Sequence, residues 1–233
     1  HLEETDNMIE KQRMIKDEEE IGYIRKACQI TDECFEYISN YIKPGMTEKQ
    51  IAKEINEYFY KNSDGLAFET IVASGENSSK PHAIPTDRQI QKDDVILIDM
   101  GCRVNGYCSD MSRTILFGQV PQYVKQIYDL VLKNQEQVLK EVKENSNTKL
   151  IAKMVDNDFR LNNYDLIHAL GHGVGLDIHE DPVLSFNSEH ILKENMIVTD
   201  EPGIYIAGQF GVRIEDTIRI TKDGCEVLTN SPK

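Results

Sequence analysis

The stretch VILIDMGCRVNGYCSDMSRTILF, residues 95–117, decides the fold of this chain. Its two arms are rich in apolar and β-branched residues, as β-strands are. Asn105 and Gly106 between the arms are typical of a two-residue type I′ turn, which needs positive φ at both positions. We therefore expect an antiparallel hairpin, with one strand over 95–101 and the returning strand over 107–117.

The turn also sets the register of this hairpin. Val104 should pair with Tyr107, and Asp99 should then lie opposite Ser112. Asp99 and Asp110 become diagonal neighbours on one face, about 7 to 8 Å apart at the backbone. Two carboxylates this close repel each other unless a cation lies between them, so the hairpin indicates a divalent metal. Alternatively, one carboxylate caps a turn or pairs with a neighbouring arginine.

Two helices are expected before the hairpin. Asp17 and Glu20 form a capping-box pattern, and apolar residues then recur at helical spacing, which predicts a helix over 18–42. Thr47 and Gln50 repeat the pattern and predict a second helix that ends before 63–65. A strand over 66–74 should follow it. The first half of the chain is thus read as helix, helix, sheet.

The same order returns after residue 121. We expect helices over 122–144 and 148–161, then strands over 196–201, 211–220 and 225–229. Within the two second helices, IAKEINEYF (51–59) and IAKMVDNDF (151–159) share Ile, Ala, Lys and Phe at an offset of 100. The predicted fold class is α+β, with two pseudo-twofold related helix-helix-sheet halves that share a curved antiparallel sheet covered by helices.

Composition limits the possible partners and location. The 233 residues include 26 Lys and Arg against 40 Asp and Glu, a net charge of −14 that should repel phosphate backbones and anionic membranes. We expect no nucleic-acid partner and no membrane association. Five cysteines without a CxxC pair suit reduced thiols in a cytoplasmic protein. The polar residues 1–16, which lack an initiator Met, are read as a linker remnant of a missing N-terminal domain.

The second half adds further candidate ligands. His172 lies among three glycines in GHGVGLDIHE (171–180), where backbone and imidazole can approach a ligand closely. Glu201 and Glu215 fall in strands that correspond to those of the first hairpin. Four carboxylates and one imidazole would offset the charge of two divalent ions, and this donor set suits Mn²⁺, Co²⁺ or Zn²⁺. Such a pair would hold a bridging hydroxide.

These residues lie in motifs that carry a family resemblance. IDMGCRVNGYCSDMSRT, HALGHGVGLDIHE, TDEPGIY and GVRIED, with KPHAIP upstream, resemble the catalytic domain of the Xaa-Pro peptidases, namely aminopeptidase P and prolidase. The resemblance covers residue 17 to the end and implies the pita-bread fold of that metallopeptidase superfamily. It also implies a catalytic domain over 17–233 and a possible homodimer.

The resemblance assigns roles to the five candidate ligands. Asp99 would be a terminal ligand of one metal ion, Asp110 and Glu215 would bridge both ions, and His172 with Glu201 would complete the second. Mn²⁺ is the ion it favours. Glu201 would also carry a proton. Asp200 stands where the family commonly has an apolar residue, so it either alters the local charge or faces away.

Further residues match family positions around the metal ions. His82 resembles the histidine that assists proton movement, and His179 resembles the one that stabilises the tetrahedral intermediate. His168 would line the proline side of the substrate pocket, so His82, His168 and His179 would all contact substrate. Tyr205 and Arg213 resemble residues that orient the carboxylate ligands. Read singly, each could instead be a surface, core or capping residue.

The activity implied is hydrolysis of the bond between an N-terminal residue and proline, in a dipeptide or a longer peptide. Two alternatives remain. A methionine aminopeptidase-type enzyme shares the ligands but has a Cys-His-Gly stretch where Lys80-Pro81-His82 stands here. A weakly active peptide-binding module of the same fold would be expected to have lost ligands that this chain retains.

Overall fold

The computed structural model describes residues 7–233 and consists of two similar halves. In the first half, two helices cover a sheet of strand order β1-β2-β5. The elements are α2 (Glu18–Tyr41), α3 (Glu48–Asn62), β1 (Ile71–Ser74), the 3₁₀ helix η1 (Gly75–Ser79), β2 (Val95–Met100), β3 (Arg103–Val104), β4 (Tyr107–Cys108) and β5 (Met111–Leu116).

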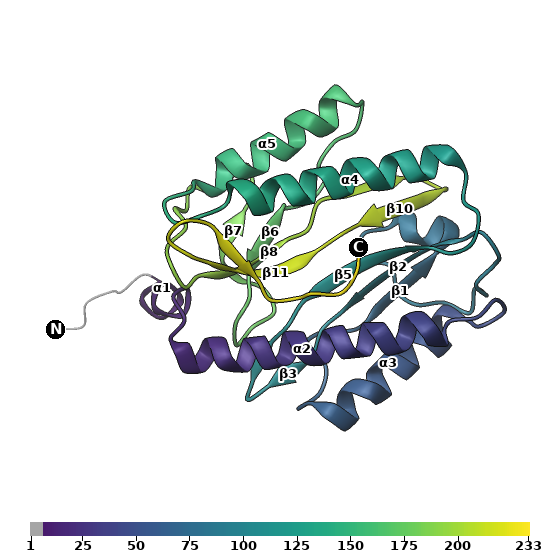
Figure 1. Ribbon diagram of the computed structural model, residues 1–233, viewed down its shortest axis with the longest axis horizontal. Helices are drawn as coiled ribbons and strands as arrows, with labels where there is room; N and C mark the ends of the chain where they lie inside the picture. Colours follow the sequence, from purple (N-terminus) through teal and green to yellow (C-terminus); the bar gives the residue numbers. More distant parts are fainter. Residues whose placement is uncertain (1–6) are drawn as a thin grey trace.

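The second half repeats this arrangement with two helices over a sheet of order β12-β11-β8-β6-β7 and a separate β9–β10 hairpin. Its elements are α4 (Gln122–Glu141), α5 (Thr148–Leu161), β6 (Gly171–Gly173), β7 (Glu180–Leu184), β8 (Ile197–Asp200), β9 (Gly203–Ile206), β10 (Phe210–Arg213), β11 (Asp216–Ile220) and β12 (Cys225–Val227). In Figure 1 the pair α4 and α5 lies on one side of the strands and α2 and α3 on the other.

The two halves match in their backbone hydrogen bonds. Gly45 N–H donates to Ile90 O at 2.9 Å, and Asn145 N–H donates to Leu192 O at 2.8 Å, close to 100 residues further on. Thr148 N–H donates to His190 O, and Glu48 N–H makes the equivalent bond in the first half. A half turn in the view of Figure 1 exchanges α2 with α4 and α3 with α5. The predicted fold class of two pseudo-twofold related halves is confirmed.

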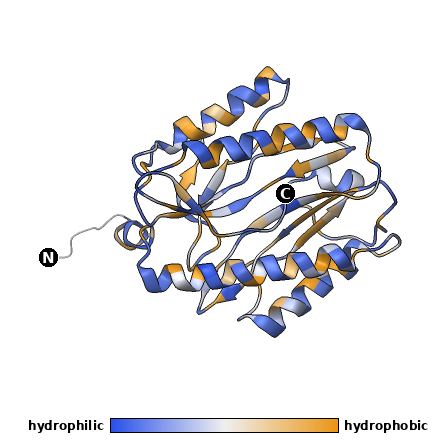
Figure 2. Ribbon diagram, viewed as in Figure 1, coloured by the Kyte–Doolittle hydropathy of each residue, from blue (hydrophilic) through white to orange (hydrophobic). Residues whose placement is uncertain are grey.

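The helices begin where their caps predict. Asp17 accepts hydrogen bonds from the N–H groups of Glu19 and Glu20, and the Glu20 side chain accepts from Asp17 N–H at 2.7 Å. Thr47 and Gln50 form the same box at the start of α3. The helices α2, α3, α4 and α5 each bury one apolar face, visible as orange and blue sides in Figure 2. No helix within 7–233 is both long and apolar enough to cross a bilayer.

The first hairpin has the predicted register. Val104 pairs with Tyr107 and Asp99 with Ser112, and φ is 48° at Asn105 and 84° at Gly106. The predicted returning strand 107–117 is wrong in one respect, because it breaks between β4 and β5. The break arises where the chain crowds Gly101: a Cβ on that residue would lie 2.0 Å from Ser109 O.

Other strand predictions also need correction. The predicted strand 211–220 is interrupted between β10 and β11, where Glu215 N–H donates instead to Ser112 O of the first half at 3.1 Å. Strand β1 is shorter than the predicted 66–74. Strands β6, β7 and β9 were not predicted, because each is only three to five residues long and contains a glycine or a proline.

Candidate metal centre

A cavity of about 370 Å³ opens where the two halves meet. It is lined by residues from both halves and includes nine of the ten predicted site residues. These are His82, Asp99, Asp110, His168, His172, His179, Glu201, Arg213 and Glu215. The tenth, Tyr205, lies behind the wall of the cavity, where it contacts two of the nine. The structure thus brings together side chains separated by up to 133 residues.

Three of the predicted ligands form the tightest group. One side-chain atom from each of Asp110, His172 and Glu215 lies within 4.8 Å of the other two, and all three residues are buried. His172 Nε2 is 3.5 Å from Asp110 Oδ2 and 3.4 Å from Glu201 Oε1. A ring nitrogen facing carboxylate oxygens at these distances leaves room for a cation between them. Glu201 therefore extends the group, and Asp99 lines the same cavity.

The strands explain how these side chains converge. Asp110 directly precedes β5 and Glu215 directly precedes β11, at the points where both predicted strands break. Asp99 lies on β2, and Glu201 follows the last residue of β8. Since β2 pairs with β5 and β8 with β11, each half presents two carboxylates at the same end of its sheet.

Hydrogen bonds between the halves hold the predicted ligands in place. Ser112 Oγ donates to Glu215 Oε2 at 2.6 Å, and Thr217 Oγ1 donates to Asp110 O at 2.7 Å. Arg213 joins this set, because its Nη2 donates to Asp99 Oδ2 at 2.7 Å and its Nε donates to Ser112 Oγ at 2.8 Å. Ser112 and Thr217 were not singled out in the sequence. Their signal was position alone, two residues after a candidate ligand.

The carboxylates crowd each other in a buried place. Burial raises the pKa of Asp110 well above its usual value, and the charge of Glu215 adds to this effect. Burial and the charge of Glu201 likewise raise the pKa of Glu215, and burial raises that of Glu201. Asp99 Oδ1 is buried and has no hydrogen-bond partner. An oxygen-rich site whose four carboxylates outnumber the single arginine that lines it, and which leaves a buried oxygen unpaired, fits divalent cations.

His172 has the form that a metal ligand requires. Burial lowers the pKa of its imidazole, which favours the neutral ring. Its Nδ1 lies 3.0 Å from Gly173 O, so a proton on Nδ1 would donate there and leave the Nε2 lone pair toward the carboxylates. A Cβ on Gly171 would lie 2.0 Å from Thr199 O, so this glycine allows β6 to approach β8 closely, whereas the close approach of a ligand that the glycine-rich motif predicts stays a prediction.

His168 and Arg213 are joined through Tyr205. The hydroxyl of Tyr205 accepts from Arg213 Nη1 at 2.8 Å and lies 3.0 Å from His168 Nε2. Burial raises the pKa of Tyr205 to about 12, so the hydroxyl keeps its proton at neutral pH. Arg213 Nη1 also donates to Pro81 O at 3.1 Å, which ties the residue before His82 to the metal centre. Arg213 thus connects both sides of the cavity.

His179 lies against His172, with ring centroids 4.4 Å apart in an edge-to-face arrangement. Burial lowers the pKa of His179, so its ring is neutral at pH 7. The next residue, Glu180, accepts from Lys16 Nζ at 2.5 Å and Arg13 Nη2 at 2.6 Å. Both cations come from the predicted linker 1–16, of which 1–6 lie outside the described residues. No motif in that segment signalled these contacts.

Asp200 faces away from the cavity. It is fully buried, and its Oδ2 accepts from Gln135 Nε2 of α4 at 3.2 Å. Burial raises the pKa of Asp200 well above its usual value. The apolar part of the cavity wall was missed in the sequence, because single apolar residues give no signal there. It includes Phe68, Ile71, Ile178 and Val183.

Fold and site together define a metal-dependent hydrolase. The sequence pattern of metallopeptidase family M24 matches residues 22–222, and the chain belongs to that family. It is 39% identical to the Xaa-Pro dipeptidase of Pyrococcus furiosus over all of this chain and 68% of that protein. Overall, the chain spans about two thirds of the length of the relatives that it matches.

Solved structures agree with this assignment. The X-Pro aminopeptidase of Thermotoga maritima MSB8 matches with a TM-score of 0.95 at 39% identity, covering 98% of this chain and 66% of that one. The Xaa-Pro dipeptidase of Bacillus anthracis matches with a TM-score of 0.96 at 39% identity, covering 98% and 65%. The similarity includes both halves and therefore the whole of the cavity.

Proposed function

We propose that this protein hydrolyses the bond between an N-terminal residue and proline, using two divalent metal ions. The observation that carries the proposal is the cavity in which four carboxylates, one buried imidazole and three further histidines converge. The names of the similar proteins, an Xaa-Pro dipeptidase and an X-Pro aminopeptidase, support the same substrate class.

We propose that two ions would share Asp110 and Glu215, because one side-chain oxygen of each lies within 4.8 Å of the other and of a His172 ring nitrogen, and the two residues come from opposite halves. Asp99 would complete one ion, and His172 with Glu201 would complete the other. When bound, such ions supply Lewis acidity and lower the pKa of a water molecule. We propose Mn²⁺, with Co²⁺ or Zn²⁺ as alternatives, because the donor set is mostly oxygen with one imidazole.

The remaining polar side chains would handle substrate and protons. A neutral His179 can donate a hydrogen bond to the oxygen of the scissile carbonyl as negative charge develops there. Glu201 or His82 would pass a proton to the prolyl nitrogen. His168 would contact the proline side of the substrate. Arg213 and Tyr205 would keep Asp99 and His168 in place.

Proline explains why a dedicated cavity is needed. An Xaa-Pro bond has no N–H to donate, and the ring fixes the local backbone. The apolar side of the cavity, with Phe68, Ile71 and Val183, would suit the ring. We also propose that the protein works in the cytoplasm, since all five cysteines are free thiols. A homodimer remains part of the proposal, and nucleic acid is not an expected partner of so acidic a chain.

The experiment is hydrolysis of an Xaa-Pro dipeptide and of a longer Xaa-Pro peptide by metal-free and Mn²⁺-loaded protein. We expect cleavage before proline only with metal, and the ratio of the two rates identifies a dipeptidase or an aminopeptidase. Matched peptides with alanine in place of proline are the control. Release of N-terminal methionine without cleavage before proline would favour the methionine aminopeptidase-type alternative. Peptide binding without any cleavage would favour the binding module.

A further inference from the structure

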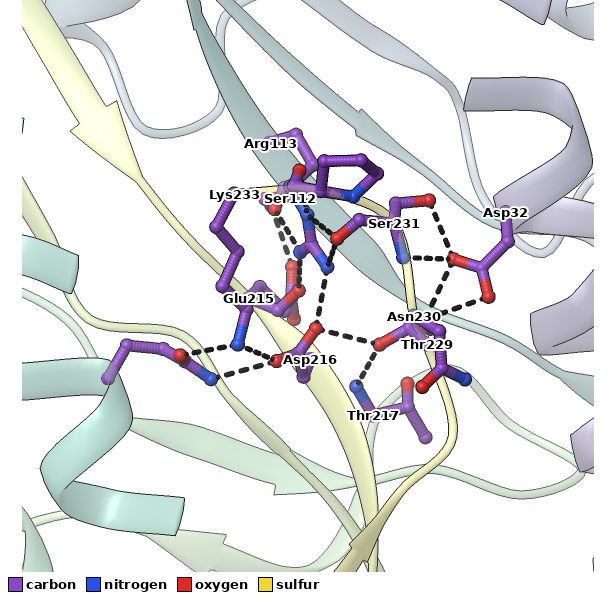
Figure 3. A network of polar contacts seen from close by, with 12 residues as sticks. Asp32, Ser112, Arg113, Glu215, Asp216, Thr217, Thr229, Asn230, Ser231 and Lys233 are labelled. Carbon is purple, nitrogen blue, oxygen red and sulfur yellow. Dashed lines mark hydrogen bonds and ion pairs between the residues drawn. The ribbon is translucent and has the colours of Figure 1, made fainter. Parts of the chain in front are cut away.

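A buried arginine lies behind the metal centre, where the two halves and the C-terminal segment (residues 229–233) meet. Arg113 belongs to β5 and is only 1% exposed. Figure 3 shows its guanidinium surrounded by acceptors from three separate parts of the chain. The proposed reaction assigns no role to it, so its burial requires another explanation.

Each nitrogen of the guanidinium has partners. Nη1 donates to Glu215 O at 2.5 Å and to Ser112 O at 3.0 Å. Nη2 donates to Asp216 Oδ1 at 2.7 Å and to Ser231 O at 2.9 Å. These four bonds use the four N–H groups of the two Nη atoms, and Nε supplies the fifth donor. Arg113 thus bonds the backbone carbonyl of a proposed metal ligand, Glu215, from the opposite half.

The C-terminal segment supplies the remaining acceptors. Nε of Arg113 lies 3.2 Å from both Ser231 O and Pro232 O. Asp32 on α2 holds this segment in place, because its carboxylate accepts from Asn230 N–H at 2.8 Å and from Ser231 N–H at 2.8 Å. Ser231 Oγ adds a bond of 2.6 Å to the same carboxylate. The segment is therefore anchored to the first half of the molecule.

A second ion pair lies at this junction, the place where the two halves and the C-terminal segment meet. Asp216, next to Glu215, is fully buried and accepts from Arg113, from Thr229 Oγ1 at 3.0 Å and from Lys233 Nζ at 2.6 Å. Gln135 of α4 bonds both Asp216, at 2.9 Å, and Lys233, at 2.7 Å. Two cations balance one buried carboxylate, and one of those cations comes from the C-terminal segment.

We propose that the C-terminal segment, acting through Arg113, is a positioning element for the metal ligands. This inference rests on the proposed dimetal function. The spacing of Asp110 and Glu215 depends on how the two halves are held together, since each ligand belongs to a different half. Arg113 donates to the Glu215 carbonyl, and the C-terminal segment bonds Arg113 in turn. Ligand groups need placement within about 0.5 Å, so a released guanidinium would loosen the site.

The test measures Mn²⁺ affinity by calorimetry on metal-free protein, with thermal unfolding of the same samples. Arg113→Lys keeps the positive charge but loses the fork of donors. We expect it to weaken Mn²⁺ binding roughly 10- to 100-fold, as loss of a group that orients a metal ligand does. Arg219→Lys is the matched control, because Arg219 lies on β11 and bonds Asn195 and Glu18, away from the cavity.

A second variant acts on the C-terminal segment and leaves Arg113 and Asp216 unchanged. Asp32→Ala removes the anchor, and we expect Mn²⁺ affinity to fall by roughly 10-fold, the lower end of that range. Asp32→Asn keeps an acceptor oxygen and should restore most of the affinity. Asp158→Ala, which removes a half-buried helix carboxylate bonded to Lys133 and Asn134, is the control and should bind Mn²⁺ like the parent protein.

The outcomes separate this inference from the function on which it rests. If Arg113→Lys and Asp32→Ala melt earlier but bind Mn²⁺ as tightly as the parent protein, the junction is only structural and the inference is wrong. If Arg113→Lys does not fold, Asp32→Ala alone decides between the same two results. If the parent protein binds no divalent ion, the dimetal function fails and this inference fails with it.

Discussion

The hairpin region β2–β5 and the region β8–β11 have the same architecture but place their carboxylates differently. Asp110 and Glu215 are equivalent, because each comes one residue before its strand. The other two carboxylates, Asp99 and Glu201, are not equivalent. Met100 pairs with Met111, and Asp200 pairs with Asp216, so Asp99 is equivalent to Thr199 while Glu201 is equivalent to Gly101. The two regions thus have equivalent central carboxylates, Asp110 and Glu215, and non-equivalent outer carboxylates, Asp99 and Glu201.

Packing explains this difference. A side chain at Gly101 would collide with Ser109 O, which excludes a carboxylate at the position that Glu201 occupies in the second half. The first half instead places its outer carboxylate two residues earlier, on the same face of the strand. Asp99 there meets Arg213, whereas Thr199 in the equivalent place bonds His172 N–H at 3.1 Å and Glu201 at 3.3 Å. The comparison predicts similar roles for the central ligands and unequal ones for their partners.

The largest effect should come from the central pair. Asp110→Asn and Glu215→Gln each remove one charge from a group that both ions would share. We expect both variants to lose activity by more than the roughly 10- to 100-fold that follows loss of an outer partner. Steady-state hydrolysis of an Xaa-Pro peptide with saturating Mn²⁺ measures this. Full activity in one variant and none in the other would break the equivalence of the two residues.

Arg213→Lys should have the next largest effect. Lysine keeps the charge but cannot bond Asp99, Ser112 and Tyr205 together. We expect a roughly 10- to 100-fold loss of kcat/KM, together with weaker Mn²⁺ binding. Arg103→Lys is the control, because Arg103, on the β3–β4 hairpin, donates to the backbone carbonyls of Gly106 and Leu176 rather than to a predicted site residue. Equal activities of the two variants would show that Asp99 needs no orienting partner.

The pH dependence of stability should depend on metal. In the metal-free protein the folded-state pKa values of Asp110 and Glu215 are raised, so their contribution to stability is full below the ordinary carboxyl pKa. That contribution is lost as pH rises through the raised values, because the two charges then repel. We expect the Tm of metal-free protein to fall over this range and Mn²⁺ to restore it. Scanning calorimetry with and without Mn²⁺ measures the gap, and a gap that does not widen with pH contradicts the prediction.

The smallest effect should come from Thr199→Val. This change removes the hydroxyl that donates to Glu201 at 3.3 Å and leaves His172 N–H without its acceptor. A hydrogen bond is worth roughly 0.5 to 1.5 kcal/mol, so we expect a loss of kcat of roughly 2- to 13-fold. Thr221→Val, a surface substitution past β11, is the control. A loss as large as that of Arg213→Lys would mean that the two outer carboxylates are held equally firmly.

Much of this arrangement could be predicted from the sequence. The Asn105-Gly106 turn fixed which strand residues face each other, and the two capping boxes fixed where α2 and α3 begin. The candidate ligands, whose metal binding stays a prediction, were chosen from motifs in which several polar residues recur in order, and the structure brings them to one cavity. These signals are local, because each depends on the geometry of a few neighbouring residues.

Other features depend on contacts between distant segments and leave no local trace. The break before β11 exists because Glu215 N–H bonds Ser112 of the other half. The burial of Arg113 depends on carbonyls more than 100 residues away. Nothing in the sequence around Lys16 indicated its ion pair with Glu180 beside the cavity. The residue pattern of one segment cannot reveal a hydrogen-bond or ion-pair partner that comes close only when the chain folds.

The most direct test of the account is anomalous diffraction at the manganese edge from crystals grown with Mn²⁺. The account predicts two peaks in the cavity where the halves meet, with Asp110 and Glu215 each contacting both. Asp99 should contact one ion, and His172 with Glu201 the other. A single peak, or peaks that these carboxylates do not share, would contradict the dimetal centre.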